Sequence, residues 1–190
     1  MAHPIEEKHY YTLEEYLELE RESDIRYEFY NGELFPIEAT TVRHNEIVQN
    51  MLLAFRAYFR PKGCKITIES VKAEVQEGVY YPYPDLMLSC DPEDTNNQML
   101  KYPVVIVEVL SPSTSSYDKS FKWRRYRKMP SLCYYLMVSQ EELLIEVFTR
   151  SGNSDIWSFQ EYNDLTNSIH FSKLDFELKM SEVYDLIAFS

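Results

Sequence analysis

The stretch VVIVEVLSPSTSSYDKSFKW, residues 104–123, decides the fold that we expect. It opens as an apolar run of the length of a buried strand, and side chains along a strand alternate between two faces. Both faces of 104–110 are apolar, which is typical of a central strand covered on both sides. Glu108 interrupts this run, although a buried ionised carboxylate is costly unless it is paired or binds a metal. Glu108 therefore belongs to a structural ion pair, to a strand that ends early and lets it reach solvent, or to a functional site.

A second carboxylate, Asp85, follows Pro84 at the start of another short strand-like segment. Proline keeps the preceding residue extended, so the aspartate can lie at the end of a strand. If this strand pairs with 104–110, Asp85 and Glu108 meet at one edge of the sheet. Two such groups repel, and a hard cation such as Mg²⁺ relieves the repulsion by taking oxygen ligands.

A helix is expected over 117–128, which contains no glycine or proline. Asp118, Lys122 and Tyr126 are four residues apart and form one stripe on it. Lys122 can therefore lean back toward Glu108. The alternative is an ordinary Asp118–Lys122 pair on an exposed helix, which contributes only a few tenths of a kcal/mol, roughly, to stability.

The same segment concentrates positive charge. Residues 117–128 contain one acidic and six basic side chains, a local balance of +5 in a chain of net charge −12. The basic side chains are Lys119, Lys122, Arg124, Arg125, Arg127 and Lys128. Trp123 and Tyr126 are interleaved with them, which favours contact with a phosphate backbone. A solvated helix face is the other interpretation.

The remaining sequence predicts a mixed α/β order. A capping-box pattern starts a short helix at Thr12, and Asn31-Gly32 predicts a hairpin over about 26–37. Apolar residues at helical spacing predict a long helix over 42–60, and 132–138 and 143–149 look like an antiparallel pair. We expect one domain over 1–190, with a central mixed sheet flanked by helices.

Composition sets further expectations. No apolar run approaches the ~18 residues that span a bilayer, and residues 1–11 have no apolar signal-peptide core, so we expect a cytoplasmic protein without a membrane partner. The three cysteines, Cys64, Cys90 and Cys133, are far apart, and we expect buried thiols. The net charge of −12 argues against a surface adapted throughout to nucleic acid, but it allows a local basic face.

Together these motifs resemble a known family. Five of them occur in order: YEFYNGEL (27–34), His44 at a helix start, PD (84–85), VEVLSPST (107–114) and D-x-x-x-K-x-x-x-Y (118–126). The set is similar to the bacterial "putative restriction endonuclease" domain family, a branch of the PD-(D/E)XK nuclease superfamily. The resemblance extends from residue 12 to the closing SEVYDLI, and it implies a restriction-endonuclease-like core that cleaves DNA with a divalent metal.

The resemblance assigns roles residue by residue. Asp85 and Glu108 match the two acids of the motif, and with the backbone carbonyl of Val109 they would hold Mg²⁺ or Mn²⁺. Leu110 stands where the superfamily pattern E-x-K has its lysine, and Lys122 matches the migrated lysine of other members. The accessory residues that we expect are Glu28, His44 and Tyr126. The side chains expected to contact DNA are Lys119, Arg124, Arg125 and Arg127.

Two other classes of function remain open. A catalytically silent nuclease fold could bind nucleic acid or protein, which would agree with the charge of −12 and with the absence of a recognisable DNA-binding domain. A structural domain could instead keep Asp85, Glu108 and Lys122 as a buried ion-pair network. For the nuclease we also expect a homodimer, because cleavage of both DNA strands needs two active sites or two visits.

Overall fold

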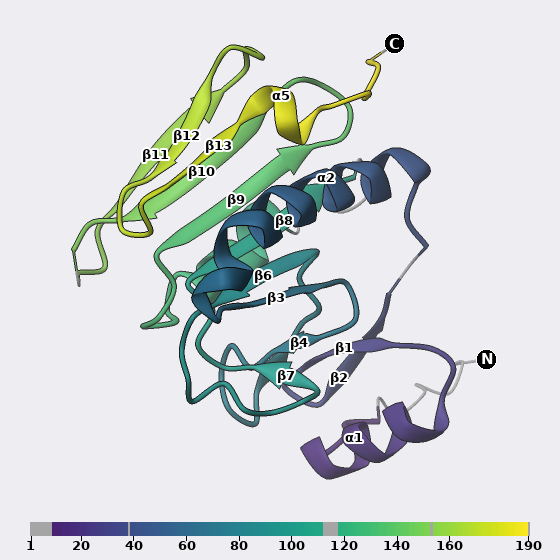
Figure 1. Ribbon diagram of the computed structural model, residues 1–190. Helices are drawn as coiled ribbons and strands as arrows, with labels where there is room; N and C mark the ends of the chain where they lie inside the picture. Colours follow the sequence, from purple (N-terminus) through teal and green to yellow (C-terminus); the bar gives the residue numbers. More distant parts are fainter. Residues whose placement is uncertain (1–8, 38, 112–117, 153, 190) are drawn as a thin grey trace.

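A six-stranded sheet forms the centre of the protein (Figure 1). The structure, a computed structural model, describes residues 9–37, 39–111, 118–152 and 154–189. The strand order is β11-β10-β9-β8-β6-β3, in which β8 and β9 run parallel and all other neighbours run antiparallel. The strands are β3 (Lys65–Ile68), β6 (Leu86–Ser89), β8 (Val105–Leu110), β9 (Tyr134–Ser139), β10 (Ile145–Arg150) and β11 (Trp157–Tyr162). The expected central mixed sheet flanked by helices is confirmed.

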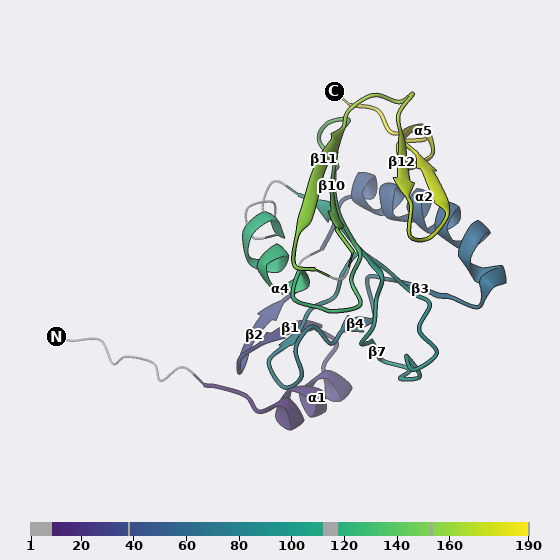
Figure 2. The ribbon, with the colours of Figure 1, turned by 90° about the vertical axis from the view of Figure 1, so that its left-hand side faces the viewer.

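One face of this sheet is covered by α2 (Val42–Phe59), the hairpin β12–β13 (Ser168–Phe171 and Phe176–Lys179) and α5 (Met180–Val183) (Figures 1 and 2). The apolar spacing that predicts the long helix also selects its buried side. The buried side chains of that stripe are Ile47, Val48, Met51, Phe55 and Phe59. They pack on alternate residues of β6, β8 and β9, so most of the core lies on this face.

The opposite face is covered by the segment between β8 and β9 (Figure 2). A regular helix was expected over 117–128. The structure instead has a π-helical turn, η2 (Asp118–Lys122), followed by one α-helical turn, α4 (Trp123–Tyr126). A π-turn uses wider i→i+5 spacing, which changes the direction of the side chains and is frequent at functional sites.

The N-terminal part forms a smaller layer. The helix α1 (Leu13–Glu22) begins at Thr12 with the expected capping box. The expected hairpin is also present, as β1 (Tyr27–Tyr30) and β2 (Glu33–Pro36), and both residues of its Asn31-Gly32 turn have positive φ. β1 also pairs with β5 (Tyr80–Tyr81), while β4 (Lys72–Ala73) pairs with β7 (Met99–Leu100). The hairpin carries Glu28 toward the main sheet.

The expectation of three thiols was wrong. Cys64 and Cys90 form a disulfide, and Cys133 is free. Cys64 precedes β3 and Cys90 follows β6, and the antiparallel register that pairs Lys65 with Ser89 places the two cysteines opposite one another. The two cysteines are 26 residues apart in the sequence, so the disulfide could not be predicted without knowing how β3 and β6 pair. Disulfides are rare in cytosolic proteins, so this bond bears on the expected location, which stays a prediction.

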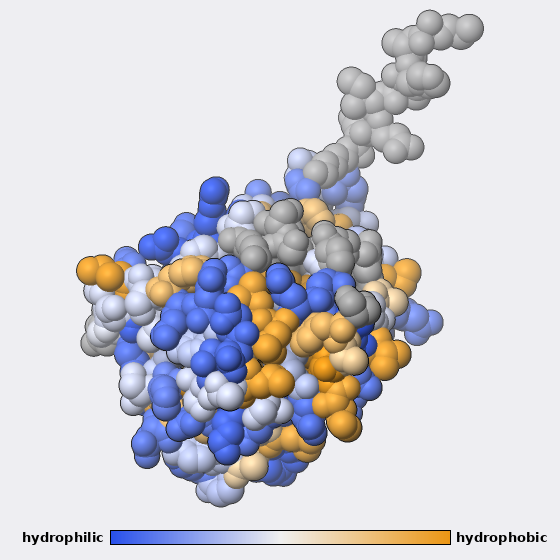
Figure 3. Space-filling model, turned by 90° about the horizontal axis from the view of Figure 1, so that it is seen from above, coloured by the Kyte–Doolittle hydropathy of each residue, from blue (hydrophilic) through white to orange (hydrophobic). Residues whose placement is uncertain are grey.

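Among the described helices, none combines the length and the apolar character needed to cross a bilayer. On the face seen from above, hydrophobic residues form several groups among hydrophilic ones (Figure 3). Among the described residues, the most exposed large hydrophobic side chains are Leu186 at 94%, Val42 at 76%, and Leu53 and Ile156 at 68% each. Single exposed apolar residues are normal on a protein surface, so they do not test the expected homodimer.

Candidate active site

Glu108 lies in the middle of the sheet, on β8. Val107 and Val109 face the α2 layer, whereas Ile106 and Leu110 face the α4 layer, so both faces of the strand are covered as expected. Glu108 shares the face of Ile106 and Leu110 by alternation, and it is only 3% exposed. A carboxylate at this depth needs partners, and its neighbours supply them.

Lys122 and Tyr126 both reach Glu108. The Tyr126 hydroxyl donates to Oε1 at 2.7 Å, and the Lys122 ammonium donates to Oε2 at 3.1 Å. Lys122 Nζ also lies 3.2 Å from Oε1 of Glu28 on β1. Lys122 is therefore a buried ammonium between two carboxylates, and not the solvated side chain of the exposed-helix alternative.

These contacts hold Tyr126 in its neutral form. Complete burial, together with the negative charge of Glu108, raises the pKa of Tyr126 well above its usual value. Tyr126 therefore remains a proton donor to Glu108 at neutral pH, and it fixes the orientation of that carboxylate.

Asp85 lies beside Glu108 at the edge where the β6–β8 ladder ends. Leu86 pairs with Val107, so the register continued by one residue sets Asp85 opposite Glu108. The Val109 N–H donates to Asp85 Oδ2 at 2.6 Å. Because the N–H and C=O of one strand residue point to the same side, the Val109 carbonyl faces the Asp85 side as well. The two acids and this carbonyl thus share one end of the sheet.

His44 stands over Asp85 from the first turn of α2, where its N–H donates to the capping hydroxyl of Thr41 at 3.1 Å. The imidazole Nε2 is 3.3 Å from Asp85 Oδ2, and Nδ1 is 4.0 Å from Glu69 Oε1. His44 therefore lies between two acids, of which the sequence singled out only Asp85.

Glu69 is the site residue that sequence reasoning missed. It follows β3, its N–H donates to the Asp85 carbonyl at 3.3 Å, and its φ of +46° is unusual for a residue with a side chain. Its Oε1 is buried without a hydrogen-bond partner among the described residues. The only sequence feature of Glu69 is its position directly after the predicted strand CKITI, and this position alone does not indicate a metal ligand or a catalytic group.

The oxygen donors at this edge suit a divalent cation. Carboxylates and a backbone carbonyl are the ligands that Mg²⁺ takes, with water completing the shell. Each carboxylate offers about four lone-pair sites, so the hydrogen bonds to Asp85 and Glu108 leave capacity for a metal. In the described part of the chain, no three His, Cys, Asp or Glu side chains converge as ligands. The fit therefore depends on two acids, the Val109 carbonyl and water, near the orphaned Glu69 oxygen.

The residues expected to contact DNA have different surroundings. Arg124 is exposed. Arg127 is exposed too, although its guanidinium donates to the Asp155 carbonyl at 3.3 Å. Arg125 instead packs 3.3 Å from the Phe121 ring centroid and donates to the Tyr30 hydroxyl at 2.5 Å, which favours a packing role. The Lys119 side chain lies outside the described part of the structure.

Two curated relatives match most of the chain. Both are uncharacterized proteins of Synechocystis sp. One, slr1290, is 28% identical over 177 residues and covers 93% of this chain and 92% of its own. The other, sll1609, is 29% identical over 164 residues, and the match covers 85% of this chain and 92% of sll1609.

A solved structure and a family model also match. The structure is described as a putative nuclease belonging to DUF820 from Anabaena variabilis, and its TM-score is 0.73. It covers 94% of this chain and 99% of its own, but at 13% identity it shows the fold alone. The family model described as "Putative restriction endonuclease" (Uma2) matches residues 13–181. The chain belongs to this putative restriction endonuclease family.

Proposed function

We propose that the protein is a Mg²⁺-dependent endonuclease that hydrolyses DNA phosphodiester bonds. Family membership supports the nuclease part of this proposal. The observation that supports it most strongly is the contact between the buried Lys122 ammonium and the Glu108 carboxylate, next to which Asp85 lies. Two acids that can bind a metal and a lysine that supplies positive charge, together at the end of the β6–β8 pair, suit metal-assisted phosphodiester hydrolysis.

Asp85, Glu108 and the Val109 carbonyl would hold the metal. Bound there, Mg²⁺ or Mn²⁺ would polarise a phosphoryl oxygen and lower the pKa of a coordinated water. The Val109 N–H orients Asp85, and the Tyr126 hydroxyl orients Glu108, so neither carboxylate rotates freely. Such orientation by neighbours is what tunes metal ligands in proteins.

Lys122 would orient the attacking water or neutralise the charge that develops on the phosphoryl oxygens. Glu28 and Glu108 keep its ammonium in place, at 3.2 and 3.1 Å. His44 would contact a phosphate oxygen, since its imidazole lies 3.3 Å from Asp85 Oδ2, beside the proposed metal ligands. DNA is the substrate class that the basic residues after η2 favour, of which Arg124, Arg127 and Lys128 are exposed.

A second candidate is a catalytically silent nuclease fold that acts as a binding module. The nearly complete burial of Glu108, with hydrogen bonds to Tyr126 and Lys122, favours it, because the same contacts make a satisfied ion-pair network. The homodimer and the cytoplasmic location remain expectations under either candidate.

The first test is nicking of supercoiled plasmid in Mg²⁺ and in Mn²⁺. We expect cleavage by the wild type that EDTA abolishes and that Asp85→Asn reduces by at least about 10²-fold, the order of effect when an electrostatic catalytic group is removed. Asp24→Asn, a change at an exposed aspartate, is the matched control and should cleave normally. Inert wild-type protein that still binds DNA would support the silent binding module instead.

A further inference from the structure

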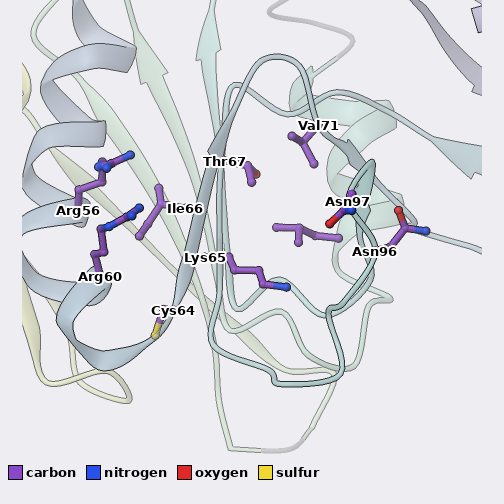
Figure 4. Close-up of a pocket in the computed structure, with 10 residues that line it drawn as sticks. Arg56, Arg60, Cys64, Lys65, Ile66, Thr67, Val71, Asn96 and Asn97 are labelled. Carbon is purple, nitrogen blue, oxygen red and sulfur yellow. The ribbon is translucent and has the colours of Figure 1, made fainter. Parts of the chain in front are cut away.

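A cavity of about 300 Å³ lies beside β3, at the edge of the six-stranded sheet (Figure 4). Its walls come from the end of α2, from β3 and from the loop that leads into β7. The lining residues are Arg56, Arg60, Cys64, Lys65, Ile66, Thr67, Val71, Asn96, Asn97 and Leu100. Figure 4 shows the two arginines on the helix side and the two asparagines on the loop side, with Lys65 between them. The proposed active-site residues do not line this cavity.

The lining is cationic in an acidic protein. It contains three basic side chains and no carboxylate, whereas the whole chain has a net charge of −12. Arg56 and Arg60 are exposed, and neither forms an ion pair with a carboxylate of the described residues. Lys65 contacts only a neutral carbonyl, that of Asp94, among its described partners. Three uncompensated cations around one hollow attract an anion.

The neutral groups of the cavity suit phosphate oxygens. Asn96 and Asn97 offer amide N–H donors, and the Thr67 hydroxyl oxygen is buried without a hydrogen-bond partner in the described part of the chain. An edge strand such as β3 also presents unpaired backbone N–H groups on its outer side. Guanidinium groups and neutral donors together are how proteins hold a nucleic-acid backbone.

The walls are held in place before any ligand arrives. The Cys64–Cys90 disulfide ties the start of β3 to the loop after β6. The buried Asp94 carboxylate organises that loop, because it accepts from the backbone N–H of Lys101 at 2.6 Å and of Tyr102 at 3.1 Å. Asn96 and Asn97 lie between these two fixed segments, so the loop should lose little conformational entropy when a ligand binds.

The cavity and the candidate active site lie near opposite ends of β3. His44 opens α2 and Arg56 lies twelve residues further along it, which corresponds to about 18 Å at 1.5 Å per residue. On the neighbouring strand, Lys65 borders the cavity and Glu69 borders Asp85. Duplex DNA rises about 3.4 Å per base pair, so about five base pairs span this distance.

We propose that the cavity beside β3 is a second phosphate-binding site, which holds the DNA backbone about five base pairs from the bond that is cut. The inference rests on the proposed function and adds to it the path of the substrate. Arg56 and Arg60 bind phosphate oxygens, Lys65 adds charge, and Thr67 with the two asparagines completes the contacts. The site positions DNA and takes no part in the chemical step.

The test measures DNA affinity apart from cleavage. Fluorescence anisotropy of a labelled 20-base-pair duplex is followed in EDTA over a range of salt concentrations, for the wild type and for Arg56→Ala/Arg60→Ala. We expect the double variant to bind on the order of tenfold more weakly, because it loses two charge-assisted contacts. The slope of log affinity against log salt should fall by about 1.8, since each phosphate contact contributes about 0.9.

Three further variants make the result specific. Arg56→Lys/Arg60→Lys keeps the charge and should retain most of the affinity and slope. Asn97→Asp adds a carboxylate to the cavity and should weaken binding. Arg21→Ala, a change at an exposed arginine of α1, should bind as the wild type does. In plasmid cleavage, the arginine double variant should raise KM and leave kcat within about twofold, as expected when binding common to ground and transition state is lost.

The outcomes separate this inference from the proposed function. If the wild type cleaves DNA but the double alanine variant keeps its affinity and salt slope, the cavity is not a DNA site and the nuclease proposal stands. If kcat falls with KM unchanged, the arginines act in chemistry and the positioning role is wrong. If the wild type neither binds nor cleaves DNA, both proposals fail.

Discussion

Lys122→Met tests the buried charge cluster most directly. The change removes the ammonium that lies 3.1 Å from Glu108 and 3.2 Å from Glu28, and their side chains are 4% and 12% exposed. Removal of one partner of a buried ion pair costs about 3–5 kcal/mol, because the remaining charge is left uncompensated. A protein of this size loses about 2–4 °C in Tm per kcal/mol, so we expect a decrease of roughly 6–20 °C at pH 8.

The loss should depend on pH in a defined direction. In the variant, two carboxylates face one another without the ammonium, so the folded state binds a proton more readily than the unfolded chain does. Stability that is linked to proton uptake increases as pH falls, and the gap from the wild type should therefore shrink between pH 8 and pH 5. Urea denaturation followed by circular dichroism at both pH values measures this difference.

Lys128→Met is the matched control, since Lys128 is an exposed lysine a few residues further along the same segment. It should change the unfolding free energy by less than about 0.5 kcal/mol. Equal stability of the Lys122 and Lys128 variants at pH 8 would refute the buried-cluster reasoning. A Lys122 variant that is less stable but cleaves plasmid at the wild-type rate would instead leave the cluster intact and remove Lys122 from the mechanism.

Two further predictions concern the disulfide and the buried tyrosines. Cys64→Ser opens a 26-residue loop and should lower the unfolding free energy by about 3.5 kcal/mol in the loop-entropy account. Cys133→Ser, at the free cysteine, is the control. If the difference in unfolding free energy between the wild type and Cys64→Ser persisted in dithiothreitol, the disulfide would not be its cause. Burial raises the pKa of six of the described tyrosines, and of four of them most strongly. For these four, stability should be fully present below about pH 10 and fall above it by about 1.4 kcal/mol per pH unit and tyrosine. Absorbance at 295 nm and urea denaturation at pH 9 and 11 measure this, and equal stability at both would contradict it. The four are Tyr16, Tyr83, Tyr126 and Tyr184.

Local patterns were enough to predict several elements. The α1 cap, the β1–β2 turn and the long helix α2 each depend on a few neighbouring residues, and each occurs where expected. The helix after β8 was predicted with the wrong geometry, because the expectation assumed regular α spacing over 117–128. In η2 the backbone widens into a π-turn, and both Lys122 and Tyr126 still reach Glu108.

Contacts between distant segments were harder to predict. Glu69 and the Cys64–Cys90 bond lie at opposite ends of the β3–β6 pair, and each depends on a register that local sequence does not specify. Arg125 shows the same limit for side chains. Its basic character predicts contact with phosphate, but Phe121 and Tyr30 hold the guanidinium against their rings. Only the packed fold brings these partners to it.

By itself, the sequence predicted a central strand around Glu108, because apolar residues on both faces of 104–110 require cover on both sides. That Glu108 itself is buried was decided by the fold, in which it is 3% exposed. It also marked Asp85 and Lys122 as companions through their motif. Tertiary structure decided the surroundings of this carboxylate. Tyr126 and Lys122 donate to it from the segment after β8, and Glu28 lies on the other side of Lys122. Asp85, which accepts from the Val109 N–H, lies beside it just before β6. The physical reason is that hydrophobic periodicity selects which face is buried, whereas the partners of a buried charge depend on strand register and helix direction.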